Sequence, residues 1–376
     1  MTEKLPLYHK LSVILIGIVV FFYILFIGQE ILVPLAFACL LAILLNPIVN
    51  FLQRKKVNKI VAIVLSIILM MLVAAGILYF IGSQASKFAD MLPELKQKVN
   101  ELAKEGLSWF SQTFNITTPK LTSWINEQKS KGMQGASGVV GATLGTVSGF
   151  FVGLFLLPVY IFLFLFYKPL LLQFIGKLFS SEKHKVVADV LNETKGLIQN
   201  YLIGLMIEMV IVAAMNSAAL MIIGIKYAIL LGVIGAILNL IPYIGGIIAI
   251  ALPMIMGLMT DDPISALYVL IAYILIQFVD NNFLVPKIVA SKVKVNAFIS
   301  IIVVLIGGTL WGVAGMFLSI PLIAILKVIF DRVEALEPFG YLIGDDMPEE
   351  EERGSLKLHT KKENKENNKE KYGLIH

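Results

Sequence analysis

The chain has 376 residues, of which 58% are hydrophobic and 15% are Asp, Glu, Lys or Arg. Ordinary soluble domains contain about 45–50% apolar and about 25% charged residues, so this composition excludes a water-soluble globule. The net charge of +5 comes from short basic clusters beside apolar runs, without interleaved aromatic side chains, which indicates membrane topology and excludes a nucleic-acid partner. The one cysteine, Cys39, excludes an intramolecular disulfide.

Long uncharged segments predict membrane-spanning helices. A run of about 20 apolar residues crosses a hydrocarbon core about 30 Å thick, so we predict an all-α polytopic membrane protein. Leu11–Gly28 is interpreted as a retained span, because no small-residue cleavage site follows it and a second apolar run begins at Ile31. The six complete spans that we expect begin close to Leu11, Ile31, Ile60, Val139, Tyr201 and Ile264.

The first three spans form the first predicted unit, residues 1–82. A turn at Gln29–Glu30 is expected to join the first two spans as a tight helical hairpin. The next loop is strongly basic and, by the positive-inside rule, lies in the cytoplasm together with the N-terminus. Its basic residues are Arg54, Lys55, Lys56 and Lys59. After the third span, Ile60–Gly82, residues 83–137 are expected to form an external arm of amphipathic helices.

The fourth span contains glycines at three- and four-residue intervals, a spacing that lets another helix approach closely. A packing seam within the protomer and a subunit interface both fit this pattern, and we expect a homo-oligomer. The glycines are Gly138, Gly141, Gly145, Gly149 and Gly153. Apolar positions from Val186 to Ile198 then predict an amphipathic helix along the cytoplasmic membrane surface, which completes a unit of residues 138–200.

Two apolar segments within residues 201–332, the predicted transport core, are too long to be single spans. As one helix, Ala228–Met259 would be about 48 Å long against a core of about 30 Å. Proline and glycine at its centre disfavour a continuous helix. Those residues are Pro242, Gly245 and Gly246, and the similar segment Ala297–Ile329 has Gly307, Gly308, Gly312 and Gly315. Each segment is predicted to be a broken or re-entrant helical hairpin.

The charges around these segments support the hairpins. The loop between them is basic, with Lys287, Lys292 and Lys294, whereas Asp261 and Asp262 lie before it. Two hairpins place the basic loop in the cytoplasm, in agreement with the positive-inside rule, and two simple spans would place it outside. The C-terminus is cytoplasmic in either arrangement, and residues 333–376 are predicted to be a charged tail.

A polar cluster near the end of the span Ile264–Leu284 is the strongest candidate site. A carboxylate beside amides offers oxygen ligands for a hard cation, and the acid could instead carry a proton. We expect Asp280 to be the central group, with Gln277, Asn281, Asn282 and Pro286 around it. The alternative interpretation is a polar cluster that ends the helix at the interface.

Glu208, in the fifth span, and Asn239, in the first hairpin, are further candidates for the solute or ion pathway. An ionisable residue within a span indicates function, although Glu208 could instead face an interface and pair with Asn200 or Asn216. We expect the bends of both hairpins to converge on Asp280 from opposite faces and to gate the pathway. Close packing alone is the alternative role of their glycines.

The sequence lacks the residues of several enzyme mechanisms. The 4 histidines lie outside the predicted spans, and neither an HExxH motif nor a phosphate-binding loop before Gly176-Lys177 is present. We therefore expect no catalytic residue, no resident metal and no cofactor. An ion gradient or the gradient of the solute would supply the energy.

Three motifs also carry a resemblance to a known family. They are Ile241-Pro242-Tyr243-Ile244-Gly245-Gly246, then Asp280-Asn281-Asn282 with Pro286, then Gly307-Gly308 through Gly315 and Pro321. With these motifs, the chain resembles the AI-2E, or autoinducer-2 exporter, family of bacterial transporters from its first span to about Phe330. The resemblance implies a multi-pass permease of the bacterial inner membrane, with some relatives linked to autoinducer-2 export and others to sodium/proton antiport.

The function expected from all of these features is secondary transport. The protein would move a small polar solute or an ion by alternating access, with autoinducer-2 as one candidate solute. A sodium (or lithium)/proton antiporter is the first alternative. A non-transporting membrane scaffold or a channel is the second.

Overall fold

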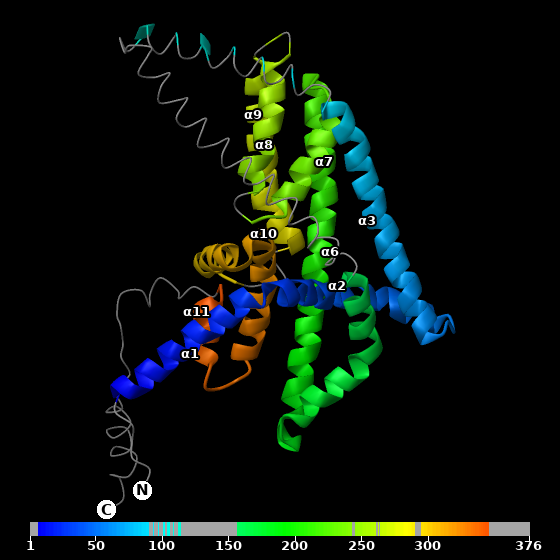
Figure 1. Ribbon diagram of the computed structural model, residues 1–376, viewed down its shortest axis with the longest axis vertical. Coiled ribbons are helices and arrows are strands. Elements are labelled where there is room, and N and C mark those ends of the chain that lie inside the picture. Colours follow the sequence, from blue (N-terminus) through cyan, green and yellow to red (C-terminus); the bar gives the residue numbers. More distant parts are fainter. Residues whose placement is uncertain are drawn as a thin grey trace, which may run out of the picture.

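The computed structural model describes residues 7–89, 156–242, 245–260, 262, 264–289 and 295–345, with isolated positions between 93 and 113. Figure 1 shows its helices. They are α1 (Leu7–Ile27), α2 (Gln29–Arg54), α3 (Lys59–Ala89), a helix at Leu156–Lys177, η1 (Ser181–Lys183), α6 (His184–Ile223), α7 (Ala228–Asn239), α8 (Gly245–Leu258), α9 (Ser265–Val279), η2 (Asp280–Val289), α10 (Ala297–Phe330) and α11 (Glu337–Ile343).

The described helices confirm an all-α polytopic membrane protein. Six of them are long and apolar enough to cross a bilayer: Gln29–Arg54, Lys59–Gln84, Leu156–Lys177, Ser181–Ile223, Ser265–Ile288 and Ala297–Phe330. Many apolar side chains on them are exposed, among them Leu72 at 65% and Ile222 at 87%. Such side chains suit contact with lipid, because in the bilayer core they face hydrocarbon and not water.

The predicted turn at Gln29–Glu30 is wrong. Helical hydrogen bonds continue across Gly28, whose amide donates to Ile24 O at 2.8 Å and whose carbonyl accepts from Leu32 N at 2.9 Å. A chain that keeps these bonds cannot reverse its direction, and Figure 1 shows α1 and α2 running end to end with a bend. Glu30 lies in the first turn of α2.

The amphipathic helix predicted along the membrane surface is also not separate. Residues 186–198 belong to α6, a continuous helix of 40 residues from His184 to Ile223. It is about 60 Å long, and Figure 1 shows it as a nearly straight rod that α2 crosses steeply. The helix ends at Gly224, because this residue takes a left-handed conformation (φ 84°) and Ile225 N donates to Leu220 O at 2.9 Å.

The first long apolar segment folds back as predicted. Helix α7 ends at Asn239 and α8 begins at Gly245. A Cβ placed on Gly235 of α7 would lie 3.6 Å from Cβ of Ala249 in α8, although a straight helix would separate these two residues by about 21 Å. The two helices therefore pack against each other, and the prediction of a hairpin is confirmed.

The second long segment, α10, also folds back. Its backbone leaves the helical conformation at Trp311 and Gly312. Ser319 Oγ donates to Val303 O at 2.8 Å, across sixteen residues that a straight helix would extend over about 24 Å. Near the bend, a Cβ on Gly307 would lie 2.5 Å from Gly315 O, so only glycines allow this approach. The hairpin is confirmed.

Three apolar clusters hold these elements together. The first joins α2, α3 and the helix Leu156–Lys177 through residues such as Ala38, Ile63 and Ile161. The second joins α2, α6 and α10, and the third joins α6, α7, α8 and α9. Within the predicted unit of residues 1–82, α1 contacts α2 and lies apart from α3, and it also contacts α10.

Some predicted features differ or lie outside the described residues. Residues 337–343, assigned to the charged tail, form α11, and Asn296 Nδ2 donates to the carbonyls at its end, including that of Leu342 at 2.7 Å. Helix α3 continues to Ala89, beyond the predicted end of the third span. The glycine seam at 138–153, most of the external arm and residues 346–376 lie outside the described part of the chain.

The bend of α10 makes a prediction about stability. Gly312 has φ 60° and ψ −143°, a backbone region that is essentially restricted to glycine, so Gly312→Ala should lower the free energy of unfolding by about 1–3 kcal/mol. The matched control is Gly196→Ala in α6, where a Cβ meets open space and where alanine should stabilise the helix by about 0.5–1 kcal/mol. Thermal unfolding in detergent measures both. Equal midpoints for the two variants would contradict the observed bend.

Candidate functional site

A partly open cavity of about 820 Å³ lies between α6, the bend of the first hairpin, α9, η2 and α10. Its charged lining residues among those described are all acidic: Glu208, Asp280 and Asp345. The other polar lining residues are Tyr201, Asn239, Tyr273, Gln277, Asn281 and Ser300. The cavity therefore presents carboxylates, amides and hydroxyls between otherwise apolar helices.

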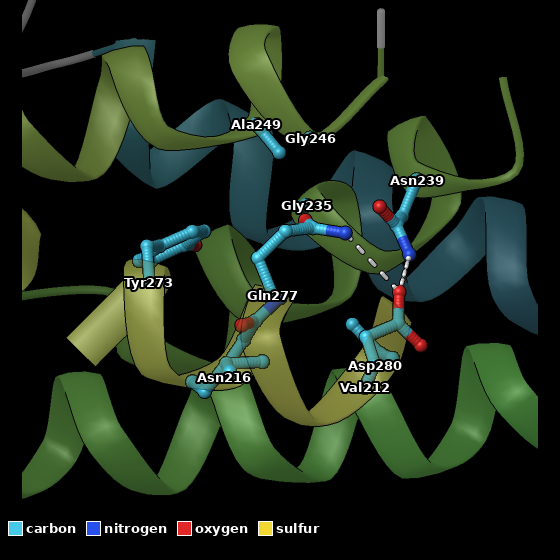
Figure 2. Close-up of a pocket in the computed structure, with 10 residues that line it drawn as sticks. Val212, Asn216, Gly235, Asn239, Gly246, Ala249, Tyr273, Gln277 and Asp280 are labelled. Carbon is cyan, nitrogen blue, oxygen red and sulfur yellow. Dashed lines mark hydrogen bonds between the residues drawn. The ribbon is translucent and has the colours of Figure 1, made fainter. Parts of the chain in front are cut away.

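Asp280 lies at the junction where α9 ends and the π-helix η2 begins. Wider π-helical turns are rare and are frequent at functional sites. The residue is 2% exposed, and its Oδ2 accepts hydrogen bonds from Asn239 Nδ2 at 2.8 Å and from Gln277 Nε2 at 3.4 Å. Figure 2 shows the two amides pointing toward the carboxylate. The end of α7 and the last turn of α9 thus hold one buried acid.

A second, very small cavity of about 10 Å³ lies beside this carboxylate. That volume is close to the smallest that holds one water molecule. Three oxygens among its lining residues are buried and have no hydrogen-bond partner among the described residues: Asn216 Oδ1, Tyr273 Oη and Asp280 Oδ1. Because such atoms are costly to bury unpaired, the pocket suits a water molecule or a small cation. Figure 2 shows its lining residues from α6, α7, α8 and α9.

Glu208 lies on α6 and lines the large cavity. It is 5% exposed, and its Oε2 has no hydrogen-bond partner in the described part of the chain. Its charge is close enough to interact with that of Asp280. The alternative of pairing with an amide is not what the structure shows, since no hydrogen bond joins Glu208 to Asn200 or Asn216 among the described residues. The cavity thus contains two neighbouring buried carboxyl groups.

The first hairpin reaches the site through its bend. Asn239, Pro242 and Gly246 line the cavity. A Cβ on Gly246 would lie 2.5 Å from Oε1 of Gln277, so the glycine leaves room for the amide that holds Asp280. Gly245 is needed for the turn itself, because a Cβ there would overlap the carbonyl of Leu238.

The second hairpin meets the cavity with its arms. Ala297, Ser300 and Ile320 line it, several turns away from the bend. The bend instead contacts α1, where Trp311 Nε1 donates to Leu25 O at 2.9 Å. The expectation that both bends converge on Asp280 therefore fits the first hairpin and not the second. The glycines Gly307, Gly308, Gly312 and Gly315 shape this second bend, and the buried Pro321 lies in the arm after it.

Two other predicted site residues lie away from the cavity. Asn282 is exposed and its Nδ2 donates to Phe278 O in the last turn of α9 at 2.8 Å. Pro286 is exposed on η2. Asn281 does line the cavity, and its Oδ1 accepts from Gln277 Nε2 at 3.1 Å.

Sequence reasoning missed Tyr273, Ser300 and the position of Asn216 in the site. Helical spacing carried a signal for two of them. Tyr273 precedes Gln277 by four residues and Asp280 by seven, and Asn216 follows Glu208 by eight, so each lies on the helix face of a predicted site residue. Ser300 had no such signal, because its place depends on how the second hairpin packs.

Comparison with known proteins identifies the family. The model of the AI-2E family transporters matches residues 13–335. The chain belongs to the AI-2E transporter family. This assignment makes it a membrane transporter, and it agrees with the resemblance carried by the three motifs.

Individual members of the AI-2E family are distant relatives. "Putative transport protein YueF" of Bacillus subtilis is 26% identical over 321 residues, which cover 81% of this chain and 84% of the relative. The "AI-2 transport protein TqsA" of Escherichia coli is 24% identical over 322 residues, which cover 85% of this chain and 90% of the relative. The likeness therefore extends over nearly the whole of each protein.

The charges of the large cavity predict how thiol reagents react there. In a Cys39→Ala background, Ser300→Cys should react with methanethiosulfonate reagents, and the cationic trimethylammonium reagent should react at least about tenfold faster than the anionic sulfonate. The matched control is Ser319→Cys, which is equally buried on α10 but lies between the hairpin arms. It should stay unmodified. Similar rates for both reagents at Ser300→Cys would contradict an acidic, water-accessible cavity.

Proposed function

We propose that this AI-2E family member is a secondary transporter that moves a small polar solute or cation by alternating access. The route passes through the 820 Å³ cavity, and Asp280 is the group that binds the solute or coupling ion. The observation that carries the proposal is the burial of this carboxylate at the meeting point of a broken hairpin and a π-helix. Broken helices around a polar site are a recurrent feature of secondary transporters.

The lining of the cavity favours some solutes over others. Its described charged residues are all acidic, so it suits a cation or an uncharged solute that donates hydrogen bonds, and disfavours an anion. Autoinducer-2 is one candidate solute, because the relative TqsA is named an AI-2 transport protein. We further propose that the protein lies in the bacterial inner membrane with both termini in the cytoplasm, on the basis of its basic loops.

Sodium/proton antiport is the second candidate function, and a specific observation favours it. Glu208 and Asp280 are neighbouring buried carboxyl groups, and the small pocket beside Asp280 is lined by three oxygens that lack a hydrogen-bond partner within the described residues. An acid in such a place can bind a proton or a hard cation in turn.

The proposed role of Asp280 is tested by flux measurements in proteoliposomes. Asp280→Asn keeps the shape of the side chain but removes its charge, and it should lower gradient-driven flux by about 10- to 100-fold, because a charge-assisted interaction is lost. The matched control is Asp189→Asn, at an exposed position on α6, which should transport as the unmodified protein does. Sodium, lithium, protons and autoinducer-2 are compared under imposed gradients.

Three outcomes would contradict the proposal. Full activity of Asp280→Asn would remove the acid from the mechanism. A solute flux that does not saturate with solute concentration and does not depend on an imposed ion gradient would indicate a channel. No flux of any tested solute by the folded, unmodified protein would favour a scaffold.

A further inference from the structure

A second polar cluster lies where α2, α3, the helix Leu156–Lys177 and α6 meet, away from the cavity. Its three half-buried lysines are Lys59, Lys168 and Lys195, and Asn46 of α2 lies beside Lys168. Lys168 Nζ donates to Asn46 Oδ1 at 2.9 Å. Lys59 Nζ donates to Phe166 O at 2.8 Å and lies 5.1 Å from the centre of the Phe166 ring. Lys59 and Lys168 thus approach each other from two helices.

The contact between α2 and α6 brings the third lysine to the same place. Pro47 has no amide hydrogen, so it leaves the carbonyl of Ile43 without its helical donor. Gln199 Nε2 of α6 donates to this carbonyl at 2.8 Å. Lys195 lies one helical turn before Gln199 and therefore on the same face of α6. The charges of both Lys59 and Lys195 act on Lys168.

Within the described part of the chain, the cluster has donors and positive charge but no acid. Among the described residues, none of the three lysines has a carboxylate within salt-bridge distance, and the acid nearest in sequence, Glu193, is bound to Arg332 at 2.7 Å. Asn46 is 6% exposed, and its buried Nδ2 has no hydrogen-bond partner in the part of the chain that the structure describes. Like charges in a half-buried site repel each other, and an unpaired buried amide is costly, so the cluster calls for a bound anion with several acceptor oxygens.

The surroundings indicate which anion. Lys59 precedes the exposed apolar side chains of Ile60 and Val61, and Lys168 lies next to the exposed Tyr167. A basic site that borders an apolar, lipid-facing surface fits a headgroup whose acyl chains lie along that surface. We propose that Lys59, Lys168, Lys195 and the amide of Asn46 form a binding site for the phosphate group of an anionic phospholipid.

Native mass spectrometry of the full-length protein in detergent tests this site. Dioleoyl-phosphatidylglycerol should bind saturably and more tightly than dioleoyl-phosphatidylcholine. Lys168→Gln and Lys195→Gln should each weaken phosphatidylglycerol binding about fivefold, since each basic group near an anionic headgroup is worth about 1 kcal/mol. The matched control is Lys177→Gln, at an exposed position of the same helix as Lys168, which should bind as the unmodified protein does.

The variant Lys195→Gln separates a loss of lipid binding from a loss of folding. Lys168 bonds to Asn46, so its loss can disturb packing, whereas the ammonium of Lys195 makes no hydrogen bond within the described residues. Thermal unfolding without lipid verifies that each variant is folded. Equal binding of the two lipids, or equal affinity of Lys195→Gln and Lys177→Gln, would overturn the proposal. Displacement of the lipid by millimolar inorganic phosphate would overturn the lipid assignment in favour of a free-anion site.

Discussion

The burial of Asp280 among apolar helices is the constraint on which the rest of the transport core depends. A carboxylate in such surroundings needs hydrogen-bond donors, since moving an isolated charge from water into an apolar interior costs a large free energy. Regular helices offer none from their backbone interior. The donors are instead side chains at two helix ends: Asn239 at the end of α7 and Gln277 in the last turn of α9. The break in the first hairpin, which follows Asn239, and the α-to-π transition at Asp280 therefore meet at the same hydrogen-bonded carboxylate.

Much of this arrangement could be predicted from the sequence, because length and backbone chemistry decide it. A helix of about 48 Å exceeds the bilayer core, and Pro242 with its glycines indicates where the chain breaks. Asp280, Gln277, Asn239 and Glu208 were predicted from their polarity within apolar segments, and all four line the cavity. Their roles in transport stay predictions.

The features that could not be predicted depend on whether a helix continues past a given residue and on which helices pack against each other. Gly28 follows an uncharged run and precedes a charge, yet its backbone bonds continue the helix, since glycine tolerates a helical conformation. In α6 the amphipathic and apolar parts follow each other without a breaking residue, so a change in polarity is not a helix boundary. The contact of Trp311 with Leu25 joins residues from opposite ends of the chain, and local sequence carries no sign of it.

The two hairpins are held in place by different interactions. The first is bound to the site by a side chain, because Asn239 donates to the titratable carboxylate of Asp280. The second is held by the close approach of Gly307 to Gly315, by Ser319 donating to Val303 O, and by Trp311 on α1, none of which involves a titratable group. A change in the charge of Asp280 therefore weakens or strengthens the attachment of the first hairpin directly. The described contacts give the second hairpin no such link to Asp280, although its arms line the same cavity.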